Sequence, residues 1–264
     1  MKKILLAGIA LAAFAGQVVA ADLPPRPAPV PYRAPPPAIV YYSWTGCFVG
    51  GNGGGLWVQK DWNVGTGDPS IGVNGIASGQ AFGSHNANGW AAGMQVGCDY
   101  QFGGGFVIGI QADYDWTGAR GNSVDAVNNA FFTTTGYRDY SQVNSLGSVT
   151  GRFGYAWDRF LGYVRGGYAW ERDNYAIVNP QNFGAAIASE TRGGWTVGIG
   201  GEYAFTNWIS AFVEYDYYNF GTTNNRFLTG TGVLFDSTDI KEQKSIIKAG
   251  INFRWSPGPV VARY

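Results

Sequence analysis

The side chains that could support catalysis or bind a metal are few. His85 is the only histidine among 264 residues, and it lies in Gly83-Ser84-His85-Asn86 without an identifiable partner. A general base needs an orienting group within hydrogen-bond reach, so we interpret His85 as a solvated side chain of a surface loop. One histidine and two distant cysteines do not have the spacing of a metal site. We therefore expect no enzyme, metal or cofactor, with a hydrolase that uses His85 as an alternative.

The two cysteines, Cys47 and Cys98, each lie in a segment that we predict to be a strand. If these strands pair with the cysteines opposite each other, a cross-strand disulfide forms, because the two Cα atoms then lie within about 7 Å. The long connection between the strands leaves the register open, so bonded and free thiols both remain alternatives. The nearby run Gly50-Gly51-Asn52-Gly53-Gly54-Gly55 lacks the Gly-Lys-Ser/Thr ending of a phosphate loop and is interpreted as a crowded strand.

The composition favours a surface in contact with lipid. The chain has 18 basic and 18 acidic residues, so it has no net charge with which to attract nucleic acid. Only 14% of residues are charged and 16% are aromatic, whereas soluble domains average about 25% charged residues. The 41 glycines suit strands that bend or crowd one another.

The first residues have the pattern of an export signal. Lys2 and Lys3 precede an apolar run and a small-residue cleavage site at Val18-Val19-Ala20, which predicts a signal peptide over residues 1–20. Residues 21–42 are rich in proline and are predicted to be a periplasmic linker. The remainder, residues 43–264, contains no apolar run that approaches the roughly 20 residues of a spanning helix.

From residue 43 onward, eight segments alternate apolar and polar side chains and are long enough to cross a bilayer as tilted strands of about 9–11 residues. Short and long connections between them alternate strictly, as in outer-membrane barrels. The sequence therefore predicts an all-β fold, an eight-stranded antiparallel transmembrane β-barrel of outer-membrane type. The segments are residues 43–58, 88–102, 106–118, 140–157, 160–173, 191–205, 208–220 and 241–255. The long loops are residues 59–87, 119–139, 174–190 and 221–240.

Two hairpins fix the register. A two-residue turn at Asp158-Arg159 places Trp157 opposite Phe160 and keeps the apolar faces of both strands together. A two-residue turn at Thr206-Asn207 would instead turn Glu214 and Asp216 toward lipid, at a cost of about 2 kcal/mol or more near the midplane. We therefore predict a three-residue turn that pairs Phe205 with Ile209.

Aromatic residues gather at the two ends of the predicted strands, as expected at the two membrane–water interfaces. The residues at the short-turn end are Trp44, Phe102, Phe106, Trp157, Phe160, Phe205, Trp208, Phe253 and Trp255. The residues toward the long loops are Trp57, Trp90, Trp116, Trp170, Trp195 and Tyr218.

The polar faces of the strands project ionisable side chains into the barrel. Eight strands enclose a space only wide enough for side chains, which favours an ion-paired plug. A narrow, slightly cation-preferring conduit would use the same residues and remains the alternative. The predicted inward side chains are Asp99, Asp113, Asp115, Arg152, Arg165, Glu171, Glu202, Glu214, Asp216, Lys248 and Arg254.

The last strand, residues 248–255, resembles the signal by which outer-membrane assembly machinery recognises a barrel. The residues that carry this signal are Lys248, Gly250, Phe253 and Trp255. Together with Trp44-Thr45-Gly46-Cys47-Phe48-Val49-Gly50-Gly51, the hairpin around Gly103 and the end Gly258-Pro259-Val260-Val261, it resembles the RopB-type outer-membrane immunogenic proteins of alpha-proteobacteria, which are barrels similar to the OmpA membrane domain.

This resemblance implies a place in the outer membrane and a general surface role, and it supplies no catalytic residues. We expect a monomeric structural protein of the envelope with exposed antigenic loops. The alternatives are a narrow porin-like channel for small solutes and an adhesin that acts through its long loops. The expected partners are outer-membrane lipid, lipopolysaccharide, the barrel assembly machinery and host or surface ligands, with no nucleic acid.

Overall fold

The structure is a computed structural model, and it describes residues 42–73, 75–125, 129, 136–179 and 184–255. The chain divides into two compact units, Met1–Ile39 and Val40–Tyr264, and all described residues belong to the second. The predicted signal peptide, nearly all of the predicted linker and the end Gly258-Pro259-Val260-Val261 lie outside the described residues. Among the residues described, no helix is long and apolar enough to cross a membrane.

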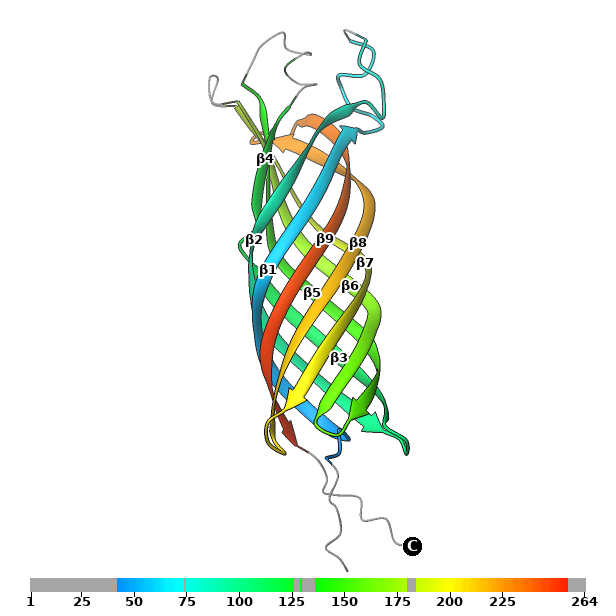
Figure 1. Cartoon of the computed structure of the whole chain (residues 1–264). Helices are drawn as coiled ribbons and strands as arrows, with labels where there is room; N and C mark the ends of the chain where they lie inside the picture. The colour runs from blue at the N-terminus through cyan, green and yellow to red at the C-terminus, as the bar shows by residue number, and fades with distance from the viewer. Residues whose placement is uncertain (1–41, 74, 126–128, 130–135, 180–183, 256–264) are drawn as a thin grey trace, which may run out of the picture. The chain divides into compact units, whose positions relative to one another are not determined.

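The second unit is a closed antiparallel barrel, as the alternating pattern predicts (Figure 1). The sheet closes because β1 pairs with both β2 and β9. β3 and β4 act as one interrupted wall strand, since both lie between β2 and β5, so the wall has the predicted eight strands. The strands are β1 (Gly46–Val64), β2 (Ala81–Gln101), β3 (Phe106–Thr117), β4 (Arg120–Val124), β5 (Arg138–Trp157), β6 (Phe160–Asn179), β7 (Gly184–Ala204), β8 (Ile209–Thr229) and β9 (Leu234–Trp255).

Both predicted turns are confirmed. Trp157 pairs with Phe160 across the Asp158-Arg159 turn, where Asp158 adopts the left-handed conformation with φ 53°. The Phe205 amide donates to the Ile209 carbonyl at 3.0 Å, and Ala204 pairs with Ser210, so three residues form the turn between β7 and β8. Glu214 and Asp216 consequently face the interior, where both are buried.

The strands extend well beyond the predicted ends, and the long loops are correspondingly shorter. The predicted loop 59–87 is reduced to residues 65–80, because β1 continues to Val64 and β2 begins at Ala81. Most of the predicted loops 174–190 and 221–240 is strand, and β4 lies inside the predicted loop 119–139. Figure 1 shows these extensions continuing the barrel wall toward the end opposite the short turns.

The extensions reverse the polarity of the wall. In the lower part, outward side chains such as Ile108 and Ile199 are apolar and inward ones are charged. In the extensions, outward side chains such as Asn86 and Arg172 are polar and exposed. Their inward neighbours form an apolar cluster of Trp62, Val64, Ile76, Tyr137, Tyr175, Ile177, Ala186, Phe227 and Ile240. This reversal follows from a change of surroundings from lipid to water along the same strand.

The two aromatic girdles are present, with two corrections. Most of the predicted girdle side chains are exposed on the outer wall. Trp44, however, is completely buried, because its indole N–H donates to the Asp158 carbonyl at 3.0 Å and its ring closes the short-turn end. Tyr218 is also completely buried, since even-numbered residues of this part of β8 point inward.

Candidate functional site

The barrel interior is the candidate functional site, because it gathers nearly all of the buried ionised groups. The structure places all eleven predicted inward side chains inside the wall, each at most 6% exposed. They do not form one continuous group of ion pairs, because ten of them pair within two separate layers and an apolar cluster lies between these and Glu171.

The lower ionic layer lies at the short-turn end and is organised by Glu202. This carboxylate accepts hydrogen bonds from Arg152 at 3.0 Å and from Arg254 Nε at 3.1 Å. Arg254 also donates to Asp99 at 2.7 Å, and its guanidinium lies over the Trp44 ring at 4.6 Å. The layer therefore pairs its acids with its bases directly above an aromatic floor.

The middle ionic layer is built around two cations. Arg165 donates to Asp113 at 2.5 Å and to Glu214 at 2.7 Å. Lys248 Nζ lies 3.3–3.7 Å from carboxylate oxygens of four residues. These residues are Asp113, Asp115, Glu214 and Asp216. Lys248, which is also predicted to be part of the assembly signal, thus lies at the centre of the middle layer.

Glycines in the wall provide room for this layer. A Cβ atom at Gly93 would overlap Asp115 Oδ1, and one at Gly198 would overlap Asp216 Oδ1. Both glycines pair directly with those aspartates across the ladder. The high glycine content therefore has a local cause here, because the narrow barrel holds a long polar side chain only where the neighbouring strand has none.

An apolar belt covers the middle layer on the side of the extensions. On β9 the belt residue Ile246 lies between Lys248 below and Lys244 above, and on β8 Tyr218 and Phe220 follow Asp216. The belt side chains are at most 5% exposed. They are Leu56, Val58, Ala87, Ala91, Ala119, Val143, Leu146, Ala169, Tyr218, Phe220 and Ile246.

Above the belt lies an upper ionic layer, of which only Glu171 was predicted. Lys60 contacts Asp173 at 2.6 Å and Glu242 at 3.0 Å. Lys244 contacts Glu242 at 2.9 Å and also pairs with Glu171. Arg192 joins the layer through Glu171 at 3.5 Å and Glu190 at 2.9 Å. Lys60 and Glu190 were missed because the membrane-crossing length ended the predicted strands before them. Asp173, Arg192, Glu242 and Lys244 lie within the predicted segments, at positions that the alternation already assigns to the inward face.

Within the part of the chain that the structure describes, a group of three carboxylates in the upper layer has the spacing that could hold a metal ion. Ligand atoms of Glu171, Asp173 and Glu242 lie within 4.8 Å of one another. The ammonium groups of Lys60 and Lys244 already contact these carboxylates and compensate their charge. The arrangement therefore suits an ion-paired layer better than a divalent cation.

The interpretation of His85 as a solvated loop residue is wrong. It lies on β2, is 9% exposed, and is paired with Lys60 in the β1–β2 ladder. Its Nε2 lies 2.8 Å from Ser141 Oγ and its Nδ1 lies 3.2 Å from Ser123 Oγ. Burial and the Lys60 charge lower the pKa of His85 to about 4. The second ring nitrogen faces a hydroxyl and not a carboxylate, so the Ser141–His85 pair lacks the orienting acid of a nucleophile–base system.

Cys47 and Cys98 are joined by a disulfide, which was one of the two alternatives. The β1–β2 register places them directly opposite each other. The bond lies near the short-turn end, where Cys98 is exposed on the outer wall.

Of the remaining assembly-signal residues, Phe253 and Trp255 are exposed outward and Gly250 faces the Phe212 ring inside. Recognition of this strand by assembly machinery remains a prediction.

Comparison with known proteins gives the fold and the location a family context. The sequence model of the autotransporter beta-domain family matches residues 38–216, more than half of the chain. The 31 kDa outer-membrane immunogenic protein of Brucella melitensis is 29% identical over 97% of this chain and 100% of its own length. The 25 kDa outer-membrane immunogenic protein of Brucella abortus is 28% identical over 91% of this chain and 95% of its own length.

Among solved structures, the outer membrane protease OmpT from Escherichia coli has a TM-score of 0.50 at 9% identity. The likeness covers 83% of this chain and 99% of that one, and it concerns the fold alone. The predicted resemblance to outer-membrane immunogenic proteins and the predicted location are confirmed by these relatives. The chain belongs to the autotransporter beta-domain family and lies in the outer membrane.

Proposed function

We propose that this protein is a non-conducting structural barrel of the outer membrane that stabilises the envelope and presents antigenic segments at the surface. The observation that carries the proposal is the filling of the interior. The eleven predicted inward charges are at most 6% exposed, although all of them point into the barrel. Side chains that lined a water-filled channel would be exposed to the water in it.

The layered arrangement explains why the interior is closed to ions. An ion that entered from either end would have to break ion pairs in a layer and then cross the apolar belt. The belt residues Leu56 and Val58 of β1 and Ile246 of β9 have side chains without any polar group that could contact the ion. Taking a charge out of water without such partners is costly, so this proposal is better supported than the narrow conduit.

Single-channel recording in a planar lipid bilayer tests this proposal directly. We expect the folded, purified protein to give no reproducible conductance steps. The variant Tyr218→Ala removes a large belt side chain and should increase ion leakage. The matched variant Tyr217→Ala removes a neighbouring side chain on the outer wall and should remain silent. Discrete steps from the unmodified protein that scale with salt concentration would refute the closed interior and support the conduit.

The surface role rests on the extensions and the relatives. The relatives are named as immunogenic outer-membrane proteins, and the connection at residues 65–80 links two strands that continue beyond the upper girdle. An adhesin would use the same segments. Replacing residues 65–80 by a short turn should leave folding intact and remove antibody recognition of that segment. Loss of binding to host or surface ligands in the same variant would favour the adhesin.

The proposal includes the absence of catalytic activity. It is supported by the His85 environment, where neither ring nitrogen contacts a carboxylate. A hydrolase would require a surface phenotype that disappears in His85→Gln while the protein remains folded.

The proposal also includes recognition of β9 by the assembly machinery, because Phe253 and Trp255 face outward where a partner can contact them during insertion.

A further inference from the structure

We propose that the outer wall of the extensions contains a binding site for the phosphorylated glycolipid of the outer leaflet, lipopolysaccharide. The site is a hollow of about 1230 Å³ on the face formed by β4 to β8, and we call it the basic groove. This inference rests on the outer-membrane location, and it is independent of whether the interior conducts. The residues that define the groove in the argument are Arg120, Gln142, Asn174, Ser189, Arg226 and Leu228.

The groove lies on the outside of the wall. On β4, β5, β6 and β7 three consecutive residues line it, and the flanking members of each triplet are the outward ones. On β6, for example, Asn174 and Ala176 face outward while the intervening Tyr175 is buried inside. The interior behind the groove is filled by Tyr175 and Arg192, so the hollow is a docking surface and not an entrance.

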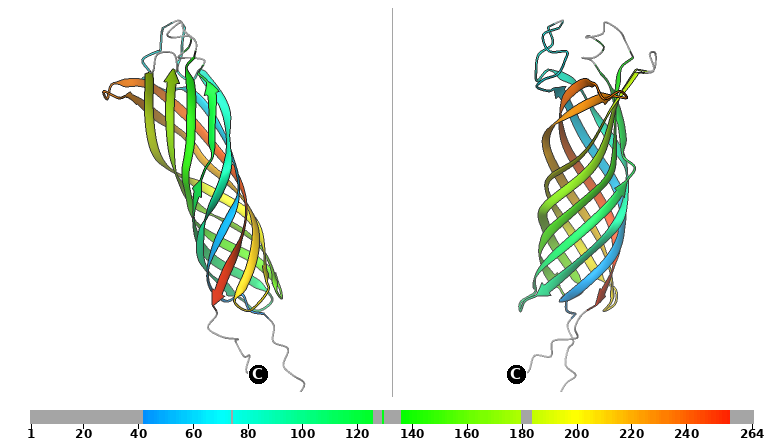
Figure 2. Two further views of the ribbon diagram at one scale, coloured as in Figure 1. Left: turned by 90° about the vertical axis from the view of Figure 1, so that its left-hand side faces the viewer. Right: turned by 180° about the vertical axis from the view of Figure 1, so that it is seen from behind.

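The hollow arises from a change in β8. Gly221 has φ +68° and interrupts the β8–β9 register, so residues above it point to the opposite side from those below. Arg226 and Leu228 therefore face outward. The β7–β8 ladder is interrupted between Ile187 and Trp195, and the end of β8 rejoins β7 at Leu228 and Thr229. Figure 2 shows the tips of β8 and β9 (orange) bending away from the barrel beside β7.

The chemistry of the groove suits a large molecule that carries phosphates and sugars. Arg120 and Arg226 are both exposed at its two sides, and no ion pair is assigned to either within the described part of the chain. Arginine guanidinium groups bind phosphate bidentately. Gln142, Asn174 and Ser189 occupy one row of paired residues between them and can hydrogen-bond sugar hydroxyls. The volume exceeds the roughly 300–1,000 Å³ of small-molecule pockets.

The position of the groove identifies the source of the phosphate. The row of Gln142 and Asn174 continues through Arg120 and Asn88 to the outward Trp57. Asn88 lies one outward position above Trp90 of the upper girdle, and at the other end of the row Ser189 lies three outward positions above Trp195. Outward side chains directly above the girdle meet the head groups of the outer leaflet. Leu228, which is 41% exposed, and Ile187, which is 65% exposed, add apolar contacts to the groove on the water side of this row.

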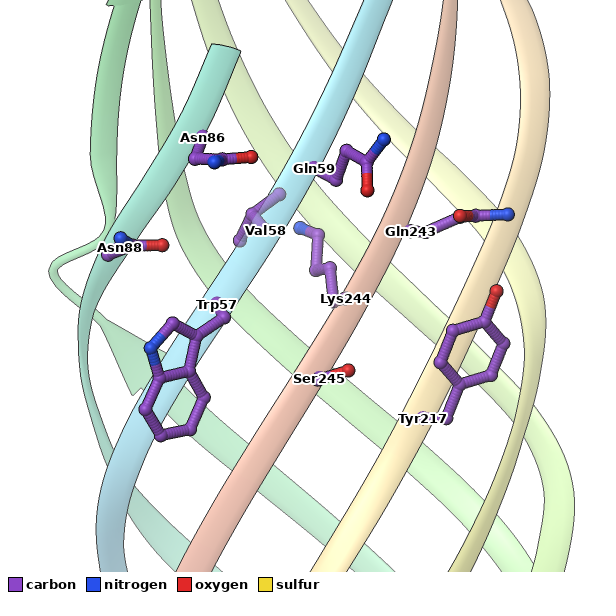
Figure 3. A pocket seen from close by; sticks show the side chains of 9 residues that line it. All are labelled: Trp57, Val58, Gln59, Asn86, Asn88, Tyr217, Gln243, Lys244 and Ser245. Carbon is purple, nitrogen blue, oxygen red and sulfur yellow. The ribbon is translucent and has the colours of Figure 1, made fainter.

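A second hollow on the same row provides an internal comparison. It has a volume of about 250 Å³ and lies over β1, β2, β8 and β9 on the outer wall (Figure 3). Figure 3 shows Trp57 below the amides of Gln59, Asn86 and Gln243. Its only cation, Lys244, points into the barrel and pairs with Glu171. It is therefore uncharged on the outside, and we do not expect it to select a phosphorylated lipid.

Titration of the folded protein in detergent with rough-type lipopolysaccharide tests the proposal. We expect Arg120→Gln combined with Arg226→Gln to weaken binding about tenfold or more, since each charge-assisted contact contributes substantially. Lys241→Gln removes an exposed outward cation of β9 outside the groove and should leave the affinity unchanged. Dephosphorylated lipopolysaccharide should bind the unmodified protein about tenfold more weakly and should not distinguish it from the double variant.

Three results would overturn the proposal. The first is that the double variant binds lipopolysaccharide with the same affinity as the unmodified protein, and the second is that Lys241→Gln weakens this binding as much as the double variant does. The third is that the unmodified protein binds phosphatidylglycerol as tightly as lipopolysaccharide, which would indicate attraction to any anionic lipid. Heat-modified migration on gels confirms that each variant is folded before titration. The conductance assay is performed on the same preparations. If the protein does not conduct and its lipopolysaccharide binding does not depend on the two arginines, only the proposal of a binding site in the basic groove is refuted. If the protein conducts and its binding does depend on the arginines, only the proposal of a closed interior is refuted.

Discussion

At the scale of single residues, the interior depends on cations that serve several acids at once. Lys248 Nζ lies within 3.7 Å of four carboxylates, and its side chain is 1% exposed. Removing one partner of a buried ion pair leaves uncompensated charge, which is more costly than losing the pair as a whole. The stability of the barrel should therefore be more sensitive to a loss of Lys248 than to a loss of any exposed charge.

We predict that Lys248→Met lowers the free energy of unfolding in lipid vesicles by about 3–5 kcal/mol. Methionine keeps the approximate volume of the side chain and removes only the charge. The control is Lys241→Met, the same substitution on the outward side of the same strand, where Lys241 is exposed opposite Asp61 in the ladder and its charge should contribute at most about 1 kcal/mol. Urea titration measures both. Equal losses in the two variants would show that the middle layer does not depend on Lys248.

His85 predicts a pH dependence with a defined sign. Its pKa in the folded protein is lowered to about 4 from an ordinary value of 6.5, so the unfolded chain binds the proton more readily between these values. The free energy of unfolding should fall as the pH decreases from 6.5 to 4, with a slope of up to about 1.4 kcal/mol per pH unit. At pH values about one unit or more above 6.5 the histidine is neutral in both states and contributes no slope.

The measurement is the difference between the unmodified protein and His85→Gln over pH 4 to 7. Taking the difference removes the contribution of Asp139, whose pKa is raised by burial and by the nearby Asp125 and Asp236. A raised carboxyl pKa has the opposite sign, because stability is then lost as the pH rises through it. Identical pH profiles for the two proteins would show that His85 is accessible to protons in the folded state.

At the scale of elements, the alternation of side chains predicted the barrel but not the ends of its strands. Within the membrane the outward residues are apolar, whereas in the extensions many outward residues, such as Asn86 and Arg172, are polar and inward residues such as Trp62 and Ile240 are apolar. A strand prediction that requires apolar outward residues over about 9–11 positions ends each strand at the membrane–water interface. Lys60 of the upper ionic layer lies beyond that limit, which is why it was not predicted as an inward residue. Arg192 and Lys244 lie inside predicted segments, where continuing the alternation would have found them.

The β7–β8 turn shows how strongly the inward set depends on register. A one-residue slip in a strand exchanges its two faces. We predict that deleting Asn207, which leaves a two-residue turn, prevents assembly because Glu214 and Asp216 would turn toward lipid. The control is deletion of Thr231 from the distal β8–β9 turn, where the wall is in contact with water. Heat-modified migration of the membrane fraction measures assembly. Normal assembly of the Asn207 deletion would refute the register argument.

At the scale of the whole molecule, the sequence predicted what lipid and geometry impose together. Closure, strand number and two hairpin registers all follow from keeping apolar side chains outside and charges inside a narrow ring. The disulfide, the burial of Trp44 and the basic groove depend on contacts between segments far apart in the chain. Trp44 lies beside Asp158, 114 residues away, and no local pattern indicates such a contact.

The same division between lipid and water predicts which tryptophans the membrane touches. Trp90 is 57% exposed on the outer wall at the upper girdle, whereas Trp62 is completely buried inside the extension and contacts Tyr175 and Phe227. In vesicles of brominated lipid, Trp90→Phe should reduce the fraction of fluorescence that the lipid quenches, because bromine quenches only nearby rings. Trp62→Phe should lower the total emission without lowering the quenched amplitude. Strong lipid quenching of Trp62 would place the extension inside the bilayer, and the polarity reversal along the strands would then require another cause.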